Sequence, residues 1–266
     1  MPLTFTAITP HPPIIIPTIG GEELKNVAQT VAAMKKLGKD FRRVQPDTVI
    51  IISPHAPFSP NAFIINSSPQ LHGNFQNFGD FKTQMEFNNN TDLAQKIFAA
   101  ATTVNIPVEH SDNPELDHGT LVPLHYLARN YHDLKIVVLS LSDHTLRDHF
   151  HYGQIIKRVI NTEPAQKIAL IASGDLSHRL TPEAPAGYSP RGQEFDELLV
   201  KLLKEKNAPE ILKLTPDLTE AAGECGLRSI CVMLGVLTDN DYDIEILSYE
   251  GPFGVGYLVT KISNTL

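Results

Sequence analysis

The sequence predicts an α/β protein: a single domain, residues 1–266, with a mixed, largely parallel sheet, helices on both faces and a C-terminal antiparallel hairpin. Two observations lead to this fold class. Short runs rich in Val, Ile and Leu alternate along the chain with longer segments of helical periodicity, as in parallel sheets whose strands are joined by helices. Two strand-like runs separated by one turn then close the chain, and these predict added antiparallel strands.

The elements follow from this alternation in order along the chain. In the first half, strands are predicted at residues 3–8, 48–53 and 62–66, and helices at 21–43 and 91–104. The polar segment 67–90, with several glycines and asparagines, is predicted to be a loop over an active site and the best candidate for a lid. In the second half, helices are predicted at 119–130, 146–161, 190–206, 208–214 and 223–237. Strands are predicted there at 135–141 and 167–173, and the hairpin at 242–249 and 254–262.

Charge and composition exclude several classes of partner. The net charge of -8 is spread along the chain, which argues against nucleic acid and against anionic membranes. The N-terminus lacks a basic stretch followed by an apolar core, and no apolar run is long enough to span a bilayer. We therefore expect a cytoplasmic protein, with a homodimer as the default assembly. Cys225 and Cys231 fall within one predicted helix and are interpreted as small core residues.

Two histidines lie in nearly identical settings. His11 in Thr-Pro-His-Pro-Pro and His55 in Ser-Pro-His-Ala-Pro each follow a predicted strand and have prolines on both sides. Proline stops a strand and stiffens the backbone where the imidazole emerges. Because ligands bind at the carboxyl ends of strands in open α/β sheets, the pair is interpreted as half of a metal site.

The residues alone leave the identity of the third ligand open. Two imidazoles and one carboxylate suit non-haem Fe(II), leaving open positions for substrate and oxygen. Glu224, in Ala-Ala-Gly-Glu-Cys-Gly-Leu, has small neighbours that would let other groups approach closely. Taken alone, Glu224 is better explained as an ordinary glutamate at a helix start. Spacing does not choose between these readings.

Two further histidines are candidates for acid and base chemistry. His118 follows Leu-Asp, and His178 lies in Ser-Gly-Asp-Leu-Ser-His after a predicted buried strand. Histidine titrates near neutrality, so a second pair beside a metal could supply an acid and a base, oriented by Asp117 and Asp175. Adjacent Asp and His are also commonplace in turns, and local sequence alone favours that ordinary reading.

Other motifs carry less chemistry. His144, His149 and His151 lack regular ligand spacing and are interpreted as solvated residues at a helix start. The sequence has neither a glycine-rich phosphate loop before a helix nor a nucleophile elbow.

Taken together, six motifs carry a resemblance: Thr9-Pro10-His11-Pro12-Pro13, Ser53-Pro54-His55, Leu116-Asp117-His118-Gly119, Ser173-Gly174-Asp175-Leu176-Ser177-His178, Gly223-Glu224-Cys225-Gly226 and Gly254-Val255-Gly256-Tyr257-Leu258. In this order they resemble the class III extradiol ring-cleavage dioxygenases, the catalytic LigB-type subunit. Within that group the chain is most similar to the branch associated with AmmeMemoRadiSam proteins, whose relatives include the Memo family.

The resemblance implies a site and a reaction. His11, His55 and Glu224 fall on the positions of the metal ligands, His178 on that of the active-site base and His118 on that of a second histidine near the substrate. The implied cofactor is Fe(II), with Zn as the alternative, and the implied substrates are a catechol-like molecule and O2. Memo-type relatives keep the fold but alter the site, so a metal protein without ring cleavage, working with a radical-SAM partner or in protein interaction, stays open.

Overall fold

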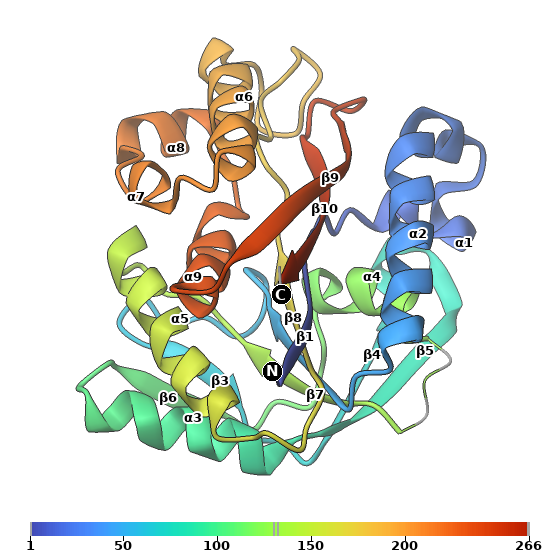
Figure 1. Ribbon diagram of the computed structural model, residues 1–266. Coiled ribbons are helices and arrows are strands. Elements are labelled where there is room, and N and C mark those ends of the chain that lie inside the picture. Colours follow the sequence, from blue (N-terminus) through green and yellow to red (C-terminus); the bar gives the residue numbers. More distant parts are fainter. Residues whose placement is uncertain (1, 130, 132, 265–266) are drawn as a thin grey trace.

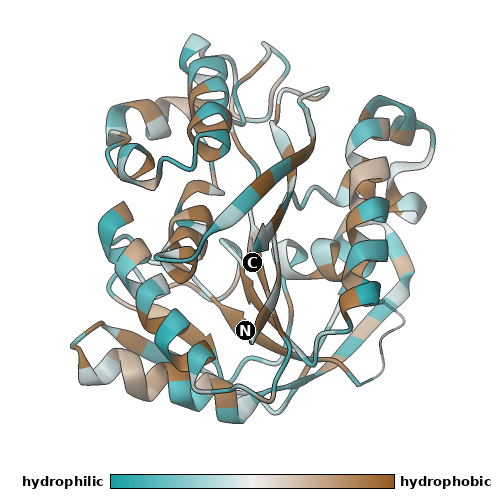
Figure 2. Cartoon of the chain, in the orientation of Figure 1, coloured by the Kyte–Doolittle hydropathy of each residue, from teal (hydrophilic) through white to brown (hydrophobic). Residues whose placement is uncertain are grey.

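Four parallel strands with almost fully buried side chains form the centre of the sheet. The computed structural model describes residues 2–129, 131 and 133–264. The central strands are β1 (Leu3–Thr9), β2 (Thr48–Ile52), β7 (Lys135–Leu139) and β8 (Ile168–Ser173). Strands buried on both faces are nearly continuous apolar runs rather than alternating ones, which is why sequence predicted all four. The brown strands in the middle of Figure 2 show this directly.

The full sheet is mixed, as predicted. Its order is β4-β5-β7-β2-β8-β1-β10-β9. The C-terminal strands β9 (Tyr242–Glu250) and β10 (Tyr257–Asn264) pair antiparallel with each other, and β10 pairs antiparallel with β1. Two short strands, β3 (Phe63–Asn66) and β6 (Val108–Ser111), pair in parallel beside β7. The sequence interpretation did not include β6.

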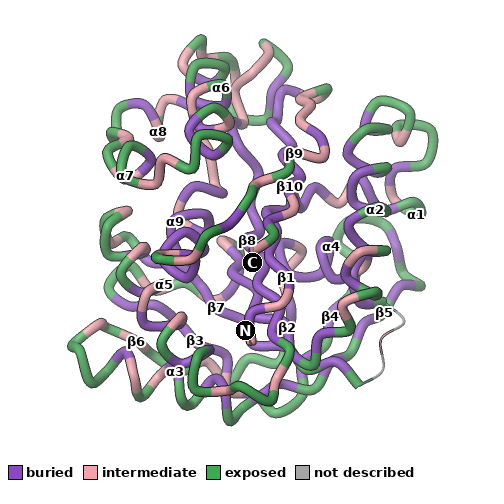
Figure 3. Tube along the Cα trace, viewed as in Figure 1, coloured by how far each residue is buried: buried purple, intermediate pink, exposed green. Residues whose placement is uncertain are grey.

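Helices cover both faces of this sheet (Figure 1). Helices α2 (Ala28–Val44) and α4 (His118–Leu127) pack on one face, and α3 (Thr91–Thr103), α5 (Leu146–Asn161) and α9 (Leu227–Leu237) on the other. Strand residues alternate between the two cores because successive side chains point to opposite faces. In β2, for example, Val49 and Ile51 join the α2 side, whereas Ile50 and Ile52 join the α5 side. Figure 3 shows the resulting buried centre.

Shorter elements lie mainly around the carboxyl ends of the strands. Helices α6 (Pro190–Lys204), α7 (Ala208–Ile211) and α8 (Pro216–Ala222) follow β8, and η1 (Pro13–Ile15), α1 (Pro17–Gly20) and η2 (Gly21–Val27) follow β1. Across the described part of the chain, none of the helices combines the length and apolarity needed to cross a membrane.

The structure corrects several of the predicted elements. The segment predicted as a loop, 67–90, is a hairpin of β4 (Gln70–Phe75), η3 (Gln76–Phe78) and β5 (Asp80–Asn89). Its polar residues alternate with buried apolar ones, and this two-residue period was missed. The helix predicted at 21–43 begins as 3-10 turns and is α-helical only from Ala28. The helix predicted at 119–130 corresponds to α4, whose predicted end at Asn130 lies outside the described residues.

Candidate metal site

The predicted metal-binding histidines meet at one edge of the sheet. Strand β8 lies between β1 and β2, so the carboxyl ends of these three parallel strands are neighbours. His11 follows β1, His55 follows β2 and Asp175 follows β8. A crevice outside the carboxyl ends, where the strand order reverses, is the usual ligand position of open α/β sheets.

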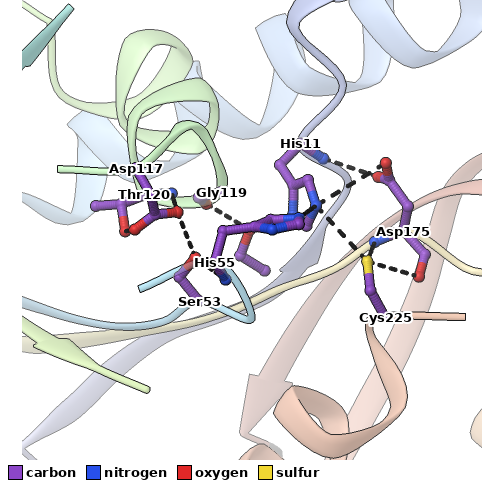
Figure 4. A network of polar contacts seen from close by, with 9 residues as sticks. His11, Ser53, His55, Asp117, Gly119, Thr120, Asp175 and Cys225 are labelled. Carbon is purple, nitrogen blue, oxygen red and sulfur yellow. Dashed lines mark hydrogen bonds and ion pairs between the residues drawn. The ribbon is translucent and has the colours of Figure 1, made fainter. Parts of the chain in front are cut away.

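Three ligand atoms converge there. The Nε2 atoms of His11 and His55 are 3.1 Å apart, and the Sγ of Cys225 is 3.6 Å from the His11 Nε2. Within the described chain these are the residues whose metal-ligating atoms all lie within 4.8 Å of one another. Figure 4 shows His11 between His55 on one side and Cys225 on the other. Typical Zn–N and Zn–S bond lengths in a tetrahedral site place two nitrogens about 3.3 Å apart and nitrogen and sulfur about 3.6 Å apart. The side chains therefore fit a single metal ion.

The tautomer of His11 is fixed by its neighbours. Its Nδ1 is 3.0 Å from the Oγ of Ser173, and that hydroxyl donates to the carbonyl oxygen of Gly119 at 2.5 Å. Because the Ser173 hydroxyl proton points to Gly119, the His11 Nδ1 must carry a proton and donate it to the Ser173 Oγ. The Nε2 lone pair is then left facing His55 and Cys225. Such outer hydrogen bonds orient metal-ligating histidines in many proteins.

Cys225 reaches the site because the chain is not helical there. The left-handed conformation of Gly223, with φ of 63°, ends α8, and α9 begins only at Leu227. Gly226 packs so closely on Gly174 that a Cβ on Gly174 would collide with the Cα of Gly226. The interpretation of Cys225 as a core residue of a helix is therefore wrong, while Cys231 is buried in α9 as predicted. The glycines that bracket Glu224 and Cys225 were the signal that could have revealed a loop here.

Asp175 links the two sides of the group. Its Oδ1 accepts the backbone N–H of His11 at 2.9 Å, and its own backbone N–H donates to the Cys225 Sγ at 3.3 Å. This N–H favours the thiolate, but it opposes the larger effect of burial, which raises the pKa of the Cys225 thiol. These contacts are with His11 and Cys225 and not with His178, the ring that Asp175 was suggested to orient.

Glu224 lies on the other side of the same loop. Its Oε2 accepts the backbone N–H of Leu227 at 2.6 Å, so the carboxylate caps the start of α9. Burial raises the pKa of Glu224 to about 7. Its carboxylate is not in the converging group, and Glu224 is among the residues that line a separate cavity. Ligation of a metal by Glu224 stays a prediction.

The electrostatics of the histidines favour their neutral, ligating form. Burial, followed by the neighbouring imidazoles of His55 and His118, lowers the pKa of His11. Burial also lowers the pKa of His55, although the Asp117 carboxylate partly opposes this. Neutral imidazole is the form that binds a metal, so both rings are ready to do so at pH 7.

His118 stands beside the two predicted ligands. Its ring centroid lies 4.2 Å from that of His55 and 5.4 Å from that of His11. Asp117 does not hold this ring; its carboxylate caps α4 through the Thr120 N–H and accepts the Ser53 hydroxyl at 2.6 Å. Phe78, at the tip of the β4–β5 hairpin, lies 5.3 Å from His118 and is 39% exposed. The hairpin tip thus reaches the site, and no sequence pattern pointed to Phe78.

His178 lies in the loop after β8, where its backbone N–H donates to the Ala222 carbonyl at 3.1 Å. Its Nδ1 is buried and has no hydrogen-bond partner among the described residues. Burial lowers the pKa of His178, so the ring is neutral at pH 7.

The remaining histidine cluster is not a second ligand group. His149 is fully buried, and its Nδ1 donates to the Thr145 carbonyl at 2.9 Å. The expectation that it is solvated is therefore wrong, because α5 turns this residue against Phe63, 4.9 Å away. His151 is exposed, and His144 is partly exposed.

An α/β sheet that gathers two imidazoles and a thiol at its switch point defines a candidate mononuclear metal protein. Comparison with known proteins gives the family. Residues 5–260 match the family described as the catalytic LigB subunit of aromatic ring-opening dioxygenase, and the chain belongs to that family.

Two curated relatives and one solved structure extend the comparison. Protein CA_C1420 of Clostridium acetobutylicum is 34% identical over 98% of this chain, which spans 58% of that longer protein. The 2-aminophenol 1,6-dioxygenase beta subunit of a Pseudomonas species is 22% identical over 96% of the chain and 92% of its own length. The crystal structure of uncharacterized protein JW3007 from Escherichia coli K12 has the same fold, with a TM-score of 0.68 and 18% identity over 97% of this chain and 99% of that one.

Proposed function

We propose that this chain is a mononuclear metal enzyme of the LigB family that opens the ring of a small aromatic molecule bearing adjacent hydroxyl or amino groups. The convergence of the His11, His55 and Cys225 ligand atoms carries the proposal. The ring-opening description of the family and the 2-aminophenol dioxygenase subunit support the reaction class.

The chemistry is divided between the metal and the surrounding side chains. When bound, Fe(II) would orient the aromatic substrate and O2 and carry electrons between them. Around it, the imidazole of His178, whose pKa is lowered by burial, would accept a substrate hydroxyl proton. His118 adds a second imidazole next to His55, and Phe78 offers an apolar surface against an aromatic ring.

Anaerobic purification followed by iron loading tests this function. Oxygen uptake and absorbance would be followed with catechol and with 2-aminophenol. We expect oxygen consumption with a yellow ring-opened product, lost in His178→Ala while the iron content is retained. Iron-loaded protein that consumes no oxygen with a broad panel of such compounds would overturn the proposal.

A second candidate is favoured by the thiol of Cys225. Thiolate ligands select zinc and copper over the oxygen-ligand metals, and a His2Cys set differs from the two-histidine, one-carboxylate set of non-haem iron oxygenases. In this alternative the chain is a zinc protein without ring cleavage, as in a Memo-like role or one beside a radical-SAM partner. It predicts one tightly bound zinc and no response to oxygen.

Two neighbouring substitutions distinguish the ligand sets. Cys225→Ser should weaken metal binding at least tenfold if Cys225 is the third ligand, whereas Glu224→Gln should leave it nearly unchanged. The opposite result would show that Glu224 is the third ligand, which is the ligand set typical of ring-cleaving iron enzymes. Metal content and affinity are measured by competition with a chromophoric chelator.

A further inference from the structure

A cavity of about 610 Å³ lies beside the metal-site loop but does not include the converging ligands. It is formed where the start of α5, the α7–α8 segment and the start of α9 meet. Gly223 and Glu224 line it, whereas the next residue, Cys225, contacts His11. One short loop therefore separates the cavity from the metal site.

Two unpaired arginines line this cavity. Arg228 is partly buried, and its Nε is enclosed without a hydrogen-bond partner. Arg147, which is exposed, lines the cavity from the first turn of α5. Over the described residues, neither guanidinium has a carboxylate oxygen within 4.0 Å, although the chain carries 30 acidic residues. A partly desolvated guanidinium without a partner destabilises the folded protein unless an anion forms hydrogen bonds with it.

Among the described residues, the acidic residues of the lining form no ion pair with these arginines within 4.0 Å, although the charge of Arg228 acts on the Glu224 carboxylate and opposes the rise in its pKa. The Glu224 carboxylate is already used in capping the Leu227 N–H at 2.6 Å. Asp143 and Glu220 are exposed at the rim, and neither forms an ion pair with Arg147 or Arg228 within the described part of the chain.

Part of the remaining lining is apolar and consists of Leu146, Leu212, Leu214, Pro216 and Leu227. The polar residues His144, Thr145 and Thr219 also line the cavity. A cavity with a cationic end and an apolar wall suits a small molecule with an anionic head and an apolar body.

We propose that this cavity binds a small organic carboxylate, with its head on Arg228 and Arg147 and its apolar body against Leu212, Leu214 and Leu227. The site is distinct from the metal centre and reaches it only through the loop 223–226. It does not depend on which metal is bound or on whether the family reaction occurs.

Calorimetry on the metal-free full-length chain tests the proposal with 3-phenylpropionate as the probe. Two comparison compounds separate the contributions of head and body. Acetate keeps the carboxylate without the body, and 3-phenylpropanol keeps the body without the charge. We expect 3-phenylpropionate to bind at least tenfold more tightly than either. Equal binding of 3-phenylpropanol, or no binding at millimolar concentration, would overturn the proposal.

Variants locate the bound molecule. Arg228→Met and Arg147→Met should each weaken binding of 3-phenylpropionate at least fivefold, whereas Arg158→Met, an exposed arginine of α5, should not change it. Arg228→Lys keeps the positive charge and replaces Arg228→Met in this test if the methionine variant does not fold. Unchanged affinity in both cavity variants contradicts the assignment. So does loss of binding in His11→Ala, because the probe would then be in the metal site.

Discussion

The hydroxyl of Ser173 decides how His11 can act. It accepts the His11 Nδ1–H and donates to the Gly119 carbonyl, so the ring presents its Nε2 to the other ligand atoms. A residue of this kind is invisible to a search for metal ligands, because serine is not one of them. Its importance comes only from a hydrogen bond between segments that are far apart in sequence.

Removing this hydroxyl should weaken the metal site without unfolding the protein. For Ser173→Ala we expect metal affinity to fall by roughly 10- to 100-fold, the usual effect of losing a hydrogen bond behind a ligating histidine. Chelator competition measures it. Ser229→Ala is the matched control, since the Ser229 hydroxyl is also buried but has no partner among the described residues. A similar loss of metal affinity in both variants would show that the loss comes from removing any buried hydroxyl and not from the hydrogen bond between Ser173 and His11.

Phe78 should contribute to substrate binding and not to metal binding. With Phe78→Ala we expect catechol binding to the metal-loaded protein to weaken by about 3- to 10-fold, because one aromatic contact is lost, while metal content is retained. Phe81→Ala is the control: Phe81 lies on the same hairpin and is 73% exposed. The prediction fails if catechol titrations of the two variants give the same affinity.

At the scale of elements, the site depends on two loops that cross at glycines. The loop after β8 and the loop before α9 approach at Gly174 and Gly226, and this contact brings Cys225 to His11. Both loops are anchored to rigid elements, β8 on one side and α9 on the other. The distance between the thiol and the imidazole is therefore set by backbone packing.

A side chain at this crossing should separate the loops. For Gly174→Ala we expect a loss of about 1–3 kcal/mol in the free energy of unfolding, as for other overpacked sites, together with weakened metal binding. Urea denaturation and metal titration measure the two effects. In Gly79→Ala, where an added Cβ meets no atom within 4 Å, metal binding should be retained. Normal metal affinity in Gly174→Ala would contradict this account of the crossing.

For the whole molecule, buried histidines make stability depend on pH. Burial lowers the pKa of His149 from 6.5 to about 4. The unfolded chain therefore takes up a proton at a higher pH than the folded chain does. Stabilisation from the neutral ring is complete above pH 6.5 and is lost as the pH falls towards 4, up to about 3 kcal/mol for a shift of this size.

This prediction can be checked by comparing stability at two pH values. We expect His149→Gln to lose less stability than the unmodified protein between pH 7.5 and pH 4.5, measured by urea denaturation. His151→Gln, at an exposed position of the same helix, should follow the unmodified protein. Parallel curves for all three proteins would exclude His149 as a source of the acid dependence.

The fold class could be predicted from the sequence because the central strands are buried on both faces and therefore consist of continuous runs of apolar residues. The hairpin β4–β5 was missed because its apolar residues alternate with polar ones, which resembles a loop in composition. The two histidines were found because prolines mark the ends of their strands. Cys225 was missed because its neighbours resemble a helix start, and only the tertiary structure shows that a loop separates α8 from α9 there.

By itself the sequence determined that two histidines follow two strands and that the strands belong to an α/β sheet. Only the tertiary structure decided that β8 lies between those strands and that Cys225, rather than Glu224, faces their imidazoles. The physical reason is that strand composition is a local property, whereas ligand convergence depends on strand order and on backbone packing between distant segments. The structure alone also revealed that Glu224 and Arg228 share a second cavity behind the metal-site loop.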